Sequence, residues 1–421
     1  MKLYRFYYRI IGLVIFFLGI LLTPFLPKLV KNELPSDMNL YVLYILNLLA
    51  CVLTYWLFSY KNCLLNAFQR RDVVSKIMIL MNTFKYTLQI IVLILFKNYY
   101  YYVFVMLAVQ ALSNIITSII VDKIYPMYKP KYEITKDERK EIGIRIRDLF
   151  TQRIGRVINS SADTLVISSF LGLTTLAIFQ NYNYVLSLPI GILSVVFESC
   201  RAGIGNSLET ETDDKNYKDL RKLTFIVGWI LTVCSTGLVC MYQHFMVIWT
   251  GQDFLFPFAM VILFVVYFYV SVLNMILDTF KDAAGIWHKD RYRPFCTAIL
   301  NLILNIIIVN IWGIYGVLLS TIISVVVVSI PWELYNLFSD VFRKEMFEYI
   351  KMIILNIIIT IVSCFIAYLI CIRFNDDGLV CFIIKGIIAL IVSNVIFFVF
   401  CYRTQDCKNS LELVSRIIRK Q

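Results

Sequence analysis

Charge is scarce in this sequence. Of its 421 residues only 16% are charged, whereas 60% are hydrophobic. Soluble globular proteins contain about 25% charged residues and bury most of their apolar side chains in a core. A soluble domain of this length could not bury so much apolar surface. The scarcity of charge therefore excludes a soluble globular protein and favours a chain that is surrounded by lipid.

Histidine and the short motifs of many enzymes are missing as well. His244 and His288 are the only histidines, and no Walker A loop, zinc-binding HExxH helix or nucleophile elbow occurs. The eleven cysteines lie mostly inside apolar runs and not in the short-spaced pairs that hold zinc or haem. We interpret them as small packing residues, with a disulfide between Cys371 and Cys381 as the minority alternative. The sequence therefore predicts no catalytic residues, no metal site and no cofactor.

The apolar residues are arranged in runs of about 20, the length that crosses a hydrocarbon core of ~30 Å as a helix. The first run is too long for a signal peptide and no small-residue cleavage site follows it, so we expect a retained first span. These runs predict an all-α integral membrane protein with about twelve transmembrane helices. The predicted spans are residues 10–30, 39–59, 77–96, 101–121, 154–176, 179–206, 223–242, 255–279, 295–311, 313–331, 349–371 and 380–401.

The distribution of Lys and Arg predicts how these helices are oriented. Thirty-two of the 40 basic residues lie at the two ends of the chain and in alternate loops, four lie in the other loops and four lie within helices. The positive-inside rule then places both termini in the cytoplasm of a multi-pass protein of the cell membrane. The net charge of +12 reflects this orientation. We expect membrane lipids as neighbours and no nucleic acid as partner.

The longest polar stretch, 122–153, separates four predicted helices from the remaining eight. Within it, Ile142, Ile146, Leu149 and Phe150 recur at helical spacing. This pattern predicts an amphipathic linker helix on the cytoplasmic membrane surface.

Polar stripes run along two consecutive predicted helices. Charged side chains within a span cost about 2.5–3.5 kcal/mol each, so they usually line a cavity or pair with a partner. In 154–176, one face combines Arg153, Arg156, Ser160 and Asp163, with Asn159 beside it. Arg153 and Arg156 could also lie at the cytoplasmic end of the helix and snorkel to the interface.

The next predicted helix, 179–206, repeats this pattern. Its stripe includes Glu198 and Arg201, which could also pair with each other at i, i+3. Pro189 and Gly191 in the middle of the helix are hinge candidates, because proline removes one backbone donor.

Three further spans carry charges. Lys85 and Asp278 are cavity candidates, whereas Lys281 and Lys385 are expected to snorkel to the interface. Cationic side chains suit phosphate oxygens, and Asn, Ser and carboxylate groups suit sugar hydroxyls. Such a cavity suits a substrate that is anionic at one end and polyhydroxylated at the other.

Two stretches carry a resemblance to a known family. Residues 163–183, DTLVISSFLGLTTLAIFQNYN, and 280–321, FKDAAGIWHKDRYRPFCTAILNLILNIIIVNIWGIYGVLLST, resemble the Wzx-type polysaccharide flippases of the multidrug/oligosaccharidyl-lipid/polysaccharide superfamily. The resemblance implies a MATE-like fold of two six-helix bundles followed by two extra helices. It also implies that the chain moves oligosaccharide units linked to undecaprenyl diphosphate from the inner to the outer leaflet, for a capsule, exopolysaccharide or O-antigen.

The resemblance also implies a division of the chain. Residues 1–121 would form a shortened first bundle of four helices, 122–153 the linker, 154–331 the second six-helix bundle, and 332–421 the two extra helices with a basic tail. A family member would have about two more helices upstream. A start placed late, a truncated gene or an unusual first bundle would each explain the difference.

The expected mechanism is alternating access, in which two bundles rock about a central cavity. The diphosphate would bind Lys85, Arg156 and Arg201, and Asp163 and Glu198 are candidates for coupling to H⁺ or Na⁺. No chemistry on the substrate is implied, so the protein is not expected to be an enzyme. Other polysaccharide assembly proteins are expected as partners.

Three other functions stay open on the sequence alone. A MATE-type multidrug exporter would have a mostly apolar cavity, and the arginines argue against it. A membrane glycan polymerase would show a long external loop, which is absent. A non-transporting scaffold of a polysaccharide assembly complex is compatible with the short first bundle.

Overall fold

The computed structural model describes residues 2–30, 38–58, 61–68, 70–126, 161–374 and 378–410. Within these ranges all regular structure is helical, and ten helices are long and apolar enough to cross a membrane. Two shorter apolar helices, Leu40–Trp56 and Ser161–Leu171, lie on the two remaining predicted spans. The prediction of an all-α membrane protein with about twelve spans is therefore confirmed.

The chain divides into two compact units, Met1–Ile142 and Gly143–Gln421. The division falls inside the segment 122–153, where the linker was predicted. Most of that segment, including the predicted amphipathic helix, lies outside the described residues. The finer division into four parts stays a prediction.

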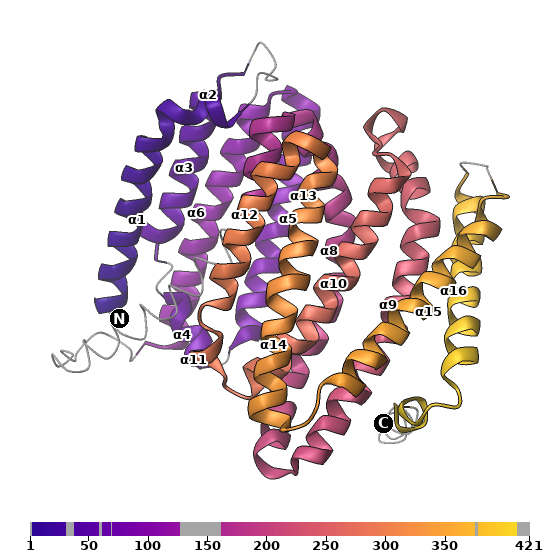
Figure 1. Cartoon of the computed structure of the whole chain (residues 1–421). Coiled ribbons are helices and arrows are strands. Elements are labelled where there is room, and N and C mark those ends of the chain that lie inside the picture. Colours follow the sequence, from indigo (N-terminus) through magenta and orange to yellow (C-terminus); the bar gives the residue numbers. More distant parts are fainter. Residues whose placement is uncertain are drawn as a thin grey trace. The chain divides into compact units, whose positions relative to one another are not determined.

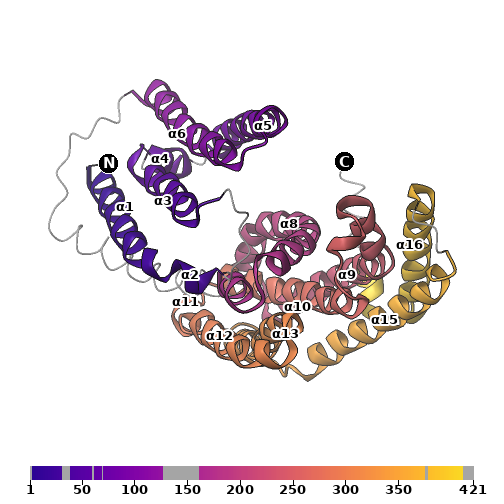
Figure 2. The ribbon, with the colours of Figure 1, turned by 90° about the horizontal axis from the view of Figure 1, so that it is seen from above.

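The first unit contains four long helices, which contact one another in the order α1, α3, α6, α5 (Figures 1 and 2). Its α3 packs between α1 and α6, and α6 also packs against α5. The short α4 is held to the end of α6 by Lys61, whose Nζ donates to Ser118 Oγ at 2.7 Å and to Asp122 Oδ2 at 2.5 Å. The elements are α1 (Lys2–Leu22), η1 (Thr23–Phe25), α2 (Leu26–Leu29), α3 (Leu40–Trp56), α4 (Asn62–Ala67), α5 (Arg71–Phe96) and α6 (Tyr99–Ile124).

The second unit begins, in its described part, with the helix Ser161–Leu171. The last turn of this helix is the π-helix η3 (Ile167–Leu171). The following elements are α8 (Leu173–Thr210), α9 (Asp213–Thr250), η4 (Gln252–Phe254), α10 (Phe258–Ala283), α11 (Trp287–Asp290), α12 (Arg293–Trp312), α13 (Ile314–Ser324), η5 (Val325–Ser329), α14 (Ile330–Asn336), η6 (Leu337–Phe342), α15 (Phe347–Cys371) and α16 (Leu379–Cys401). The elements from α13 to η6 follow one another without a break and form one span, Ile314–Phe342.

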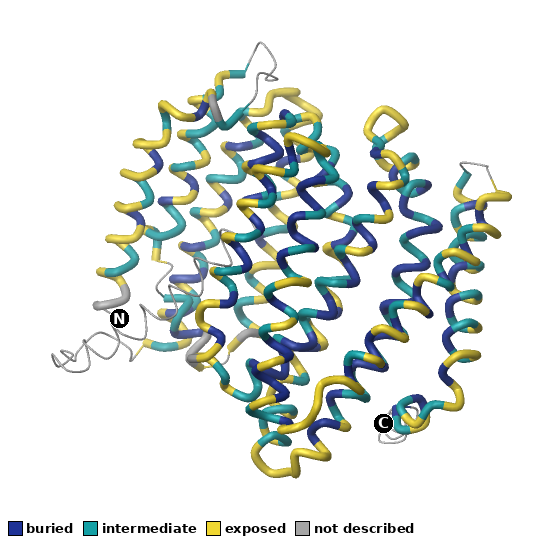
Figure 3. The backbone as a smooth tube through the Cα atoms, viewed as in Figure 1, coloured by how far each residue is buried: buried dark blue, intermediate teal, exposed yellow. Residues whose placement is uncertain are grey.

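Burial in the second unit is concentrated on α9 and α10. In the most apolar segments of α9 and α10, 56% and 50% of the residues are buried, against 17% in that of α16. Figure 3 shows where the buried residues lie. Aromatic rings pack where α8, α9 and α10 meet: Tyr182 stacks on Phe264, and its hydroxyl donates to Gln243 at 3.0 Å. We therefore take α9 and α10 as the interior of this unit, while α16 presents a largely apolar surface that suits lipid.

The helices α15 and α16, on the two predicted extra spans, pack against α9 (Figure 2). Trp229 Nε1 donates to Asn394 Oδ1 at 2.9 Å, and Thr232 and Thr360 share a hydrogen bond of 2.8 Å. Cys371 and Cys381 are both buried free thiols, so the alternative of a disulfide between them is wrong.

Two helices are much longer than predicted. The sequence predicted spans at 179–206 and 223–242, yet α8 and α9 each contain 38 residues, which is about 57 Å of helix. Hydropathy marks only the part of a helix that lies in hydrocarbon, and the polar residues beyond it still favour helix. Thr212 caps α9 by accepting a hydrogen bond from the Lys215 amide at 3.4 Å. The predicted loop 207–222 is therefore mostly helical.

Gly316 allows α12 and α13 to pack closely. A Cβ at this position would lie 2.7 Å from the backbone carbonyl carbon and oxygen of Ile308, which cannot easily move. We expect Gly316→Ala to lower the free energy of unfolding by about 1–3 kcal/mol, measured by thermal unfolding of the purified protein in detergent. Gly237→Ala is the control, because a Cβ on Gly237 meets no atom within 4 Å. Equal stability of the two variants would contradict the close approach.

Candidate functional site

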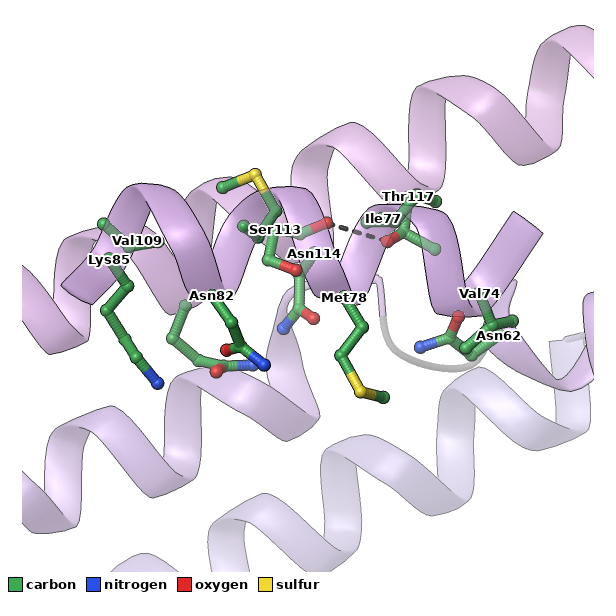
Figure 4. Close-up of a pocket in the computed structure, with 12 residues that line it drawn as sticks. Asn62, Val74, Ile77, Met78, Asn82, Lys85, Val109, Ser113, Asn114 and Thr117 are labelled. Atoms are coloured by element: carbon green, nitrogen blue, oxygen red, sulfur yellow. Dashed lines mark hydrogen bonds between the residues drawn. The ribbon is translucent and has the colours of Figure 1, made fainter. Parts of the chain in front are cut away.

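A polar pocket lies between α5 and α6 in the first unit (Figure 4). Its volume is about 320 Å³, and Lys85 is the charged residue of its lining. Figure 4 shows Lys85 at one end of the row of lining side chains and Asn62 at the other. The polar lining residues besides Lys85 are Asn62, Asn82, Gln110, Ser113, Asn114 and Thr117.

The pocket has the polarity of a binding site within two otherwise apolar helices. Lys85 Nζ lies 4.4 Å from the ring centroid of Tyr86, so a cation–π contact supports the ammonium group. Asn114 Nδ2 donates to the Thr54 carbonyl at 3.4 Å, and Thr117 Oγ1 donates to the Ser113 carbonyl at 2.8 Å. The pocket therefore offers one positive charge and several amide and hydroxyl groups.

Sequence reasoning identified Lys85 but missed its neighbours. Gln110, Ser113, Asn114 and Thr117 recur at i, i+3, i+4 and i+7 in one predicted span, which places them on one helix face. That periodicity was the signal that could have found the pocket.

A second polar cluster surrounds Asp163 in the second unit. Asn305 Nδ2 donates to Asp163 Oδ1 at 2.7 Å, and Thr321 Oγ1 lies 3.1 Å from Asp163 Oδ2. Asn301 Nδ2 donates to Thr321 Oγ1 at 2.8 Å. Asn301 and Asn305 are fully buried, and Asn305 Oδ1 has no hydrogen-bond partner in the described part of the chain. The cluster therefore presents a carboxylate, a free amide oxygen and a hydroxyl, which are oxygen donors of the kind that hard cations bind.

Asp278 belongs to a third cluster, an ion network at one end of α10 and α12. Arg293 Nη2 donates to Asp278 Oδ1 at 2.8 Å, and Lys281 Nζ lies 3.1 Å from the same oxygen. Lys281 was expected to snorkel, but its side chain is only 3% exposed because it is surrounded by Asp278, Asp282 and Asp290. The expectation of snorkelling is therefore wrong for Lys281.

Glu198 and Arg201 both lie on exposed positions of α8. Arg201 Nη2 lies 3.4 Å from Asp282 Oδ2 of α10, so the arginine reaches the edge of the ion network. Arg201 belongs to the second unit and Lys85 to the first, and their common role stays a prediction.

The hinge candidates lie inside one continuous helix. Pro189 is within α8, and a Cβ on Gly191 would meet no atom within 4 Å. Close packing against a neighbouring element therefore does not explain why glycine occupies position 191. The remaining two candidates, Arg156 and Asn159, lie outside the described residues.

Two comparisons with known proteins gave a match. Residues 5–199 match the family model described as polysaccharide biosynthesis protein. No curated protein matches the sequence. A solved structure of the lipid II flippase MurJ in its inward closed conformation superposes with a TM-score of 0.72 at 16% sequence identity, covering 95% of this chain and 83% of that one. The predicted flippase-like fold is thus confirmed: this chain is a multi-pass membrane protein with the fold of the flippase MurJ, and its residues 5–199 match the model of the polysaccharide biosynthesis protein family.

Proposed function

We propose that this protein moves oligosaccharide repeat units linked to undecaprenyl diphosphate across the cytoplasmic membrane by alternating access, for synthesis of a surface polysaccharide. The observation that carries the proposal is the polar pocket with one cation, Lys85, between two membrane-spanning helices of a chain with a flippase fold. Polar groups within hydrocarbon are costly, and they usually mark a substrate pathway. The protein acts as a transporter and not as an enzyme.

In this mechanism the polar head of the substrate crosses through the protein while the lipid tail stays in the bilayer. The Lys85 ammonium binds a phosphate oxygen, and the amides of Asn82, Gln110 and Asn114 bind sugar hydroxyls. Arg156 and Arg201 provide further cationic groups along the pathway. The protein lies in the inner membrane with both termini in the cytoplasm, and other polysaccharide assembly proteins act beside it.

The Asp163 cluster supplies the coupling site. A monovalent cation or proton that binds between Asp163 Oδ2, Asn305 Oδ1 and Thr321 Oγ1 would tie the helix Ser161–Leu171 to α12 and α13. Binding and release of this ion would then bias the second unit toward one of two conformations. Glu198, exposed on α8, is the other candidate for this role.

Gene deletion tests the function directly. Cells without the gene should accumulate lipid-linked repeat units on the inner leaflet and lose surface glycan, and the intact gene should restore both. Unchanged glycan without accumulation would refute transport by this protein. Accumulation that persists after complementation would argue for a role elsewhere in the assembly.

Substitution of Lys85 tests the pocket. A hydrogen bond to a charged group contributes about 1.5–3 kcal/mol, so we expect Lys85→Ala to lower export roughly tenfold or more, whereas Lys85→Arg keeps most of it. Lys123→Ala is the matched control, because Lys123 is an exposed lysine in the last turn of α6. Export is measured as surface glycan at equal protein level. Full activity of Lys85→Ala would remove this pocket from the pathway.

A further inference from the structure

The ion network at the end of α10 contains more acids than bases. Arg201 contacts the network at its edge through Asp282 and is the third cation within reach. Among the described residues, the network together with Arg201 contains four carboxylates and three cations, so one carboxylate lacks a counter-charge. The six residues of the network itself are Asp278, Lys281, Asp282, Asp290, Arg293 and Glu333.

Glu333 is the completely buried carboxylate that receives no hydrogen bond from the network, whereas Asp282, whose Oδ1 also lacks one, lies beside two cations, Lys281 and Arg201. Arg293 donates through Nε to Asp290 Oδ1 at 2.7 Å and through Nη1 to Ser329 Oγ. The two hydrogens of Arg293 Nη2 are directed to Asp278 Oδ1 at 2.8 Å and Asp290 Oδ2 at 3.1 Å. Glu333 Oε1 lies 2.8 Å from Nη2, but no N–H group among the described residues donates to either Glu333 oxygen. The guanidinium therefore attracts Glu333 without donating to it.

The surroundings of Glu333 make a bare carboxylate unfavourable. The side chain is completely buried, at 0% exposure. The charged groups that face it are Asp278 and Lys281 of α10 and Arg293 of α12, and the neighbouring carboxyl of Asp278 repels it. A buried carboxylate that receives no hydrogen bond is costly, and two adjoining carboxyl groups can share a hydrogen bond only when one of them carries a proton.

We propose that Glu333 is a proton-binding site and that it exchanges its proton with water through Asp278. The route follows from exposure, because the side chain of Asp278 is 32% exposed whereas that of Glu333 is fully enclosed. Loss of the proton leaves a second negative charge beside Asp278. The positive charge of Arg293 must then neutralise carboxylates on α10, α11 and α14 together. The proton therefore links the charge of the network to the packing of these helices.

The proposal extends the proposed function, on which its coupling step rests. If the chain is a flippase, protonation of Glu333 is one step of its transport cycle. This site is separate from the Asp163 cluster, since Asp163 contacts Asn305 and Thr321 farther along α12 and α13.

Infrared difference spectroscopy of the full-length protein in lipid nanodiscs tests the proton directly. We expect the wild type to show a carboxylic-acid carbonyl band that disappears as the sample is titrated to alkaline pH. The band should be missing in Glu333→Gln and present in Glu345→Gln, which removes an exposed carboxylate as a control. Absence of the band from the wild type, or its persistence in Glu333→Gln, would overturn the proposal.

A second variant keeps the test decisive if Glu333→Gln does not fold. Asp278→Asn removes the neighbouring negative charge, so Glu333 should lose its proton at a lower pH. An unchanged midpoint would show that the titrating group does not adjoin Asp278, against the proposal.

Reconstituted transport separates this proposal from the proposed function. Flipping by the wild type should respond to an imposed pH gradient, and flipping by Glu333→Gln should not. A response that survives in Glu333→Gln would overturn the coupling step. If the wild type fails to flip the substrate under any gradient but retains the titrating band, the flippase function is refuted and the proton site remains supported.

Discussion

Replacing Arg293 by alanine is expected to lower the free energy of unfolding by about 3–5 kcal/mol, the usual cost of breaking a buried ion pair by removing one partner. Arg293 is only 5% exposed, and it is the cation that contacts Asp278, Asp290 and Glu333 together. Without it, Lys281 alone must neutralise the interior of the network. The measurement is thermal unfolding of the purified protein in detergent, together with the yield of monodisperse protein.

The neighbouring arginine provides the control for this experiment. Arg291 is exposed, and its guanidinium lies 4.4 Å from the ring centroid of Tyr292. Exposed substitutions usually change stability by less than about 0.5 kcal/mol, so Arg291→Ala should unfold like the wild type. Arg293→Lys should be intermediate, because one ammonium cannot reproduce the fork of a guanidinium. If Arg293→Ala were as stable as Arg291→Ala, the network would not hold α10, α12 and α14 together.

Arg293 also shows where sequence reasoning failed. Orientation was predicted by counting basic residues in loops, and Arg293 was counted as one more positive charge on the cytoplasmic side. The structure places it in the first turn of α12, almost completely buried. A sequence shows which residues are charged, but the partners that allow a charge to be buried come from distant positions such as Glu333.

The spacing along α12 did contain a usable signal. Arg293, Thr297, Asn301 and Asn305 recur every four residues, and all four are buried. Polar residues at this interval form one stripe along a helix, and here the stripe joins the Asp278 network to the Asp163 cluster. Sequence reasoning named one cavity candidate in each cluster and missed the helix that connects them, because it searched for charged residues within spans and the stripe beyond Arg293 is uncharged.

The helices themselves were predictable because hydrocarbon imposes a length of about 20 apolar residues. The same rule underestimated α8 and α9, whose ends carry polar residues such as Asp213 and Lys215 and extend beyond the apolar segment. The pocket at Lys85 was only half predicted for a related reason. A lone lysine in an apolar run attracts attention, whereas Gln110 and Asn114 are uncharged and were not considered as site candidates.

Asp163→Asn should shift the ion dependence of transport to much higher ion concentrations while leaving the protein stable. Asp163 accepts hydrogen bonds from Asn305 and Thr321, but no basic side chain pairs with it in the parts of the chain that the structure describes. Removing a charge that has no such partner does not leave an opposite charge unpaired, so the unfolding temperature should be equal or higher. The substitution should instead lower the affinity for the coupling ion, because this ion binds the Asp163 carboxylate.

The size of that loss follows from the energy of interactions with a charged group, about 1.5–3 kcal/mol. Since 1.4 kcal/mol corresponds to about tenfold in affinity, the ion concentration for half-maximal flipping should rise roughly 10- to 100-fold in Asp163→Asn. Flipping is measured in proteoliposomes over a series of Na⁺ concentrations and pH values, with Asp253→Asn as the control because Asp253 is exposed on η4. An unchanged ion dependence would show that the Asp163 cluster only holds its helix against α12 and α13, and the coupling ion would then have to bind elsewhere.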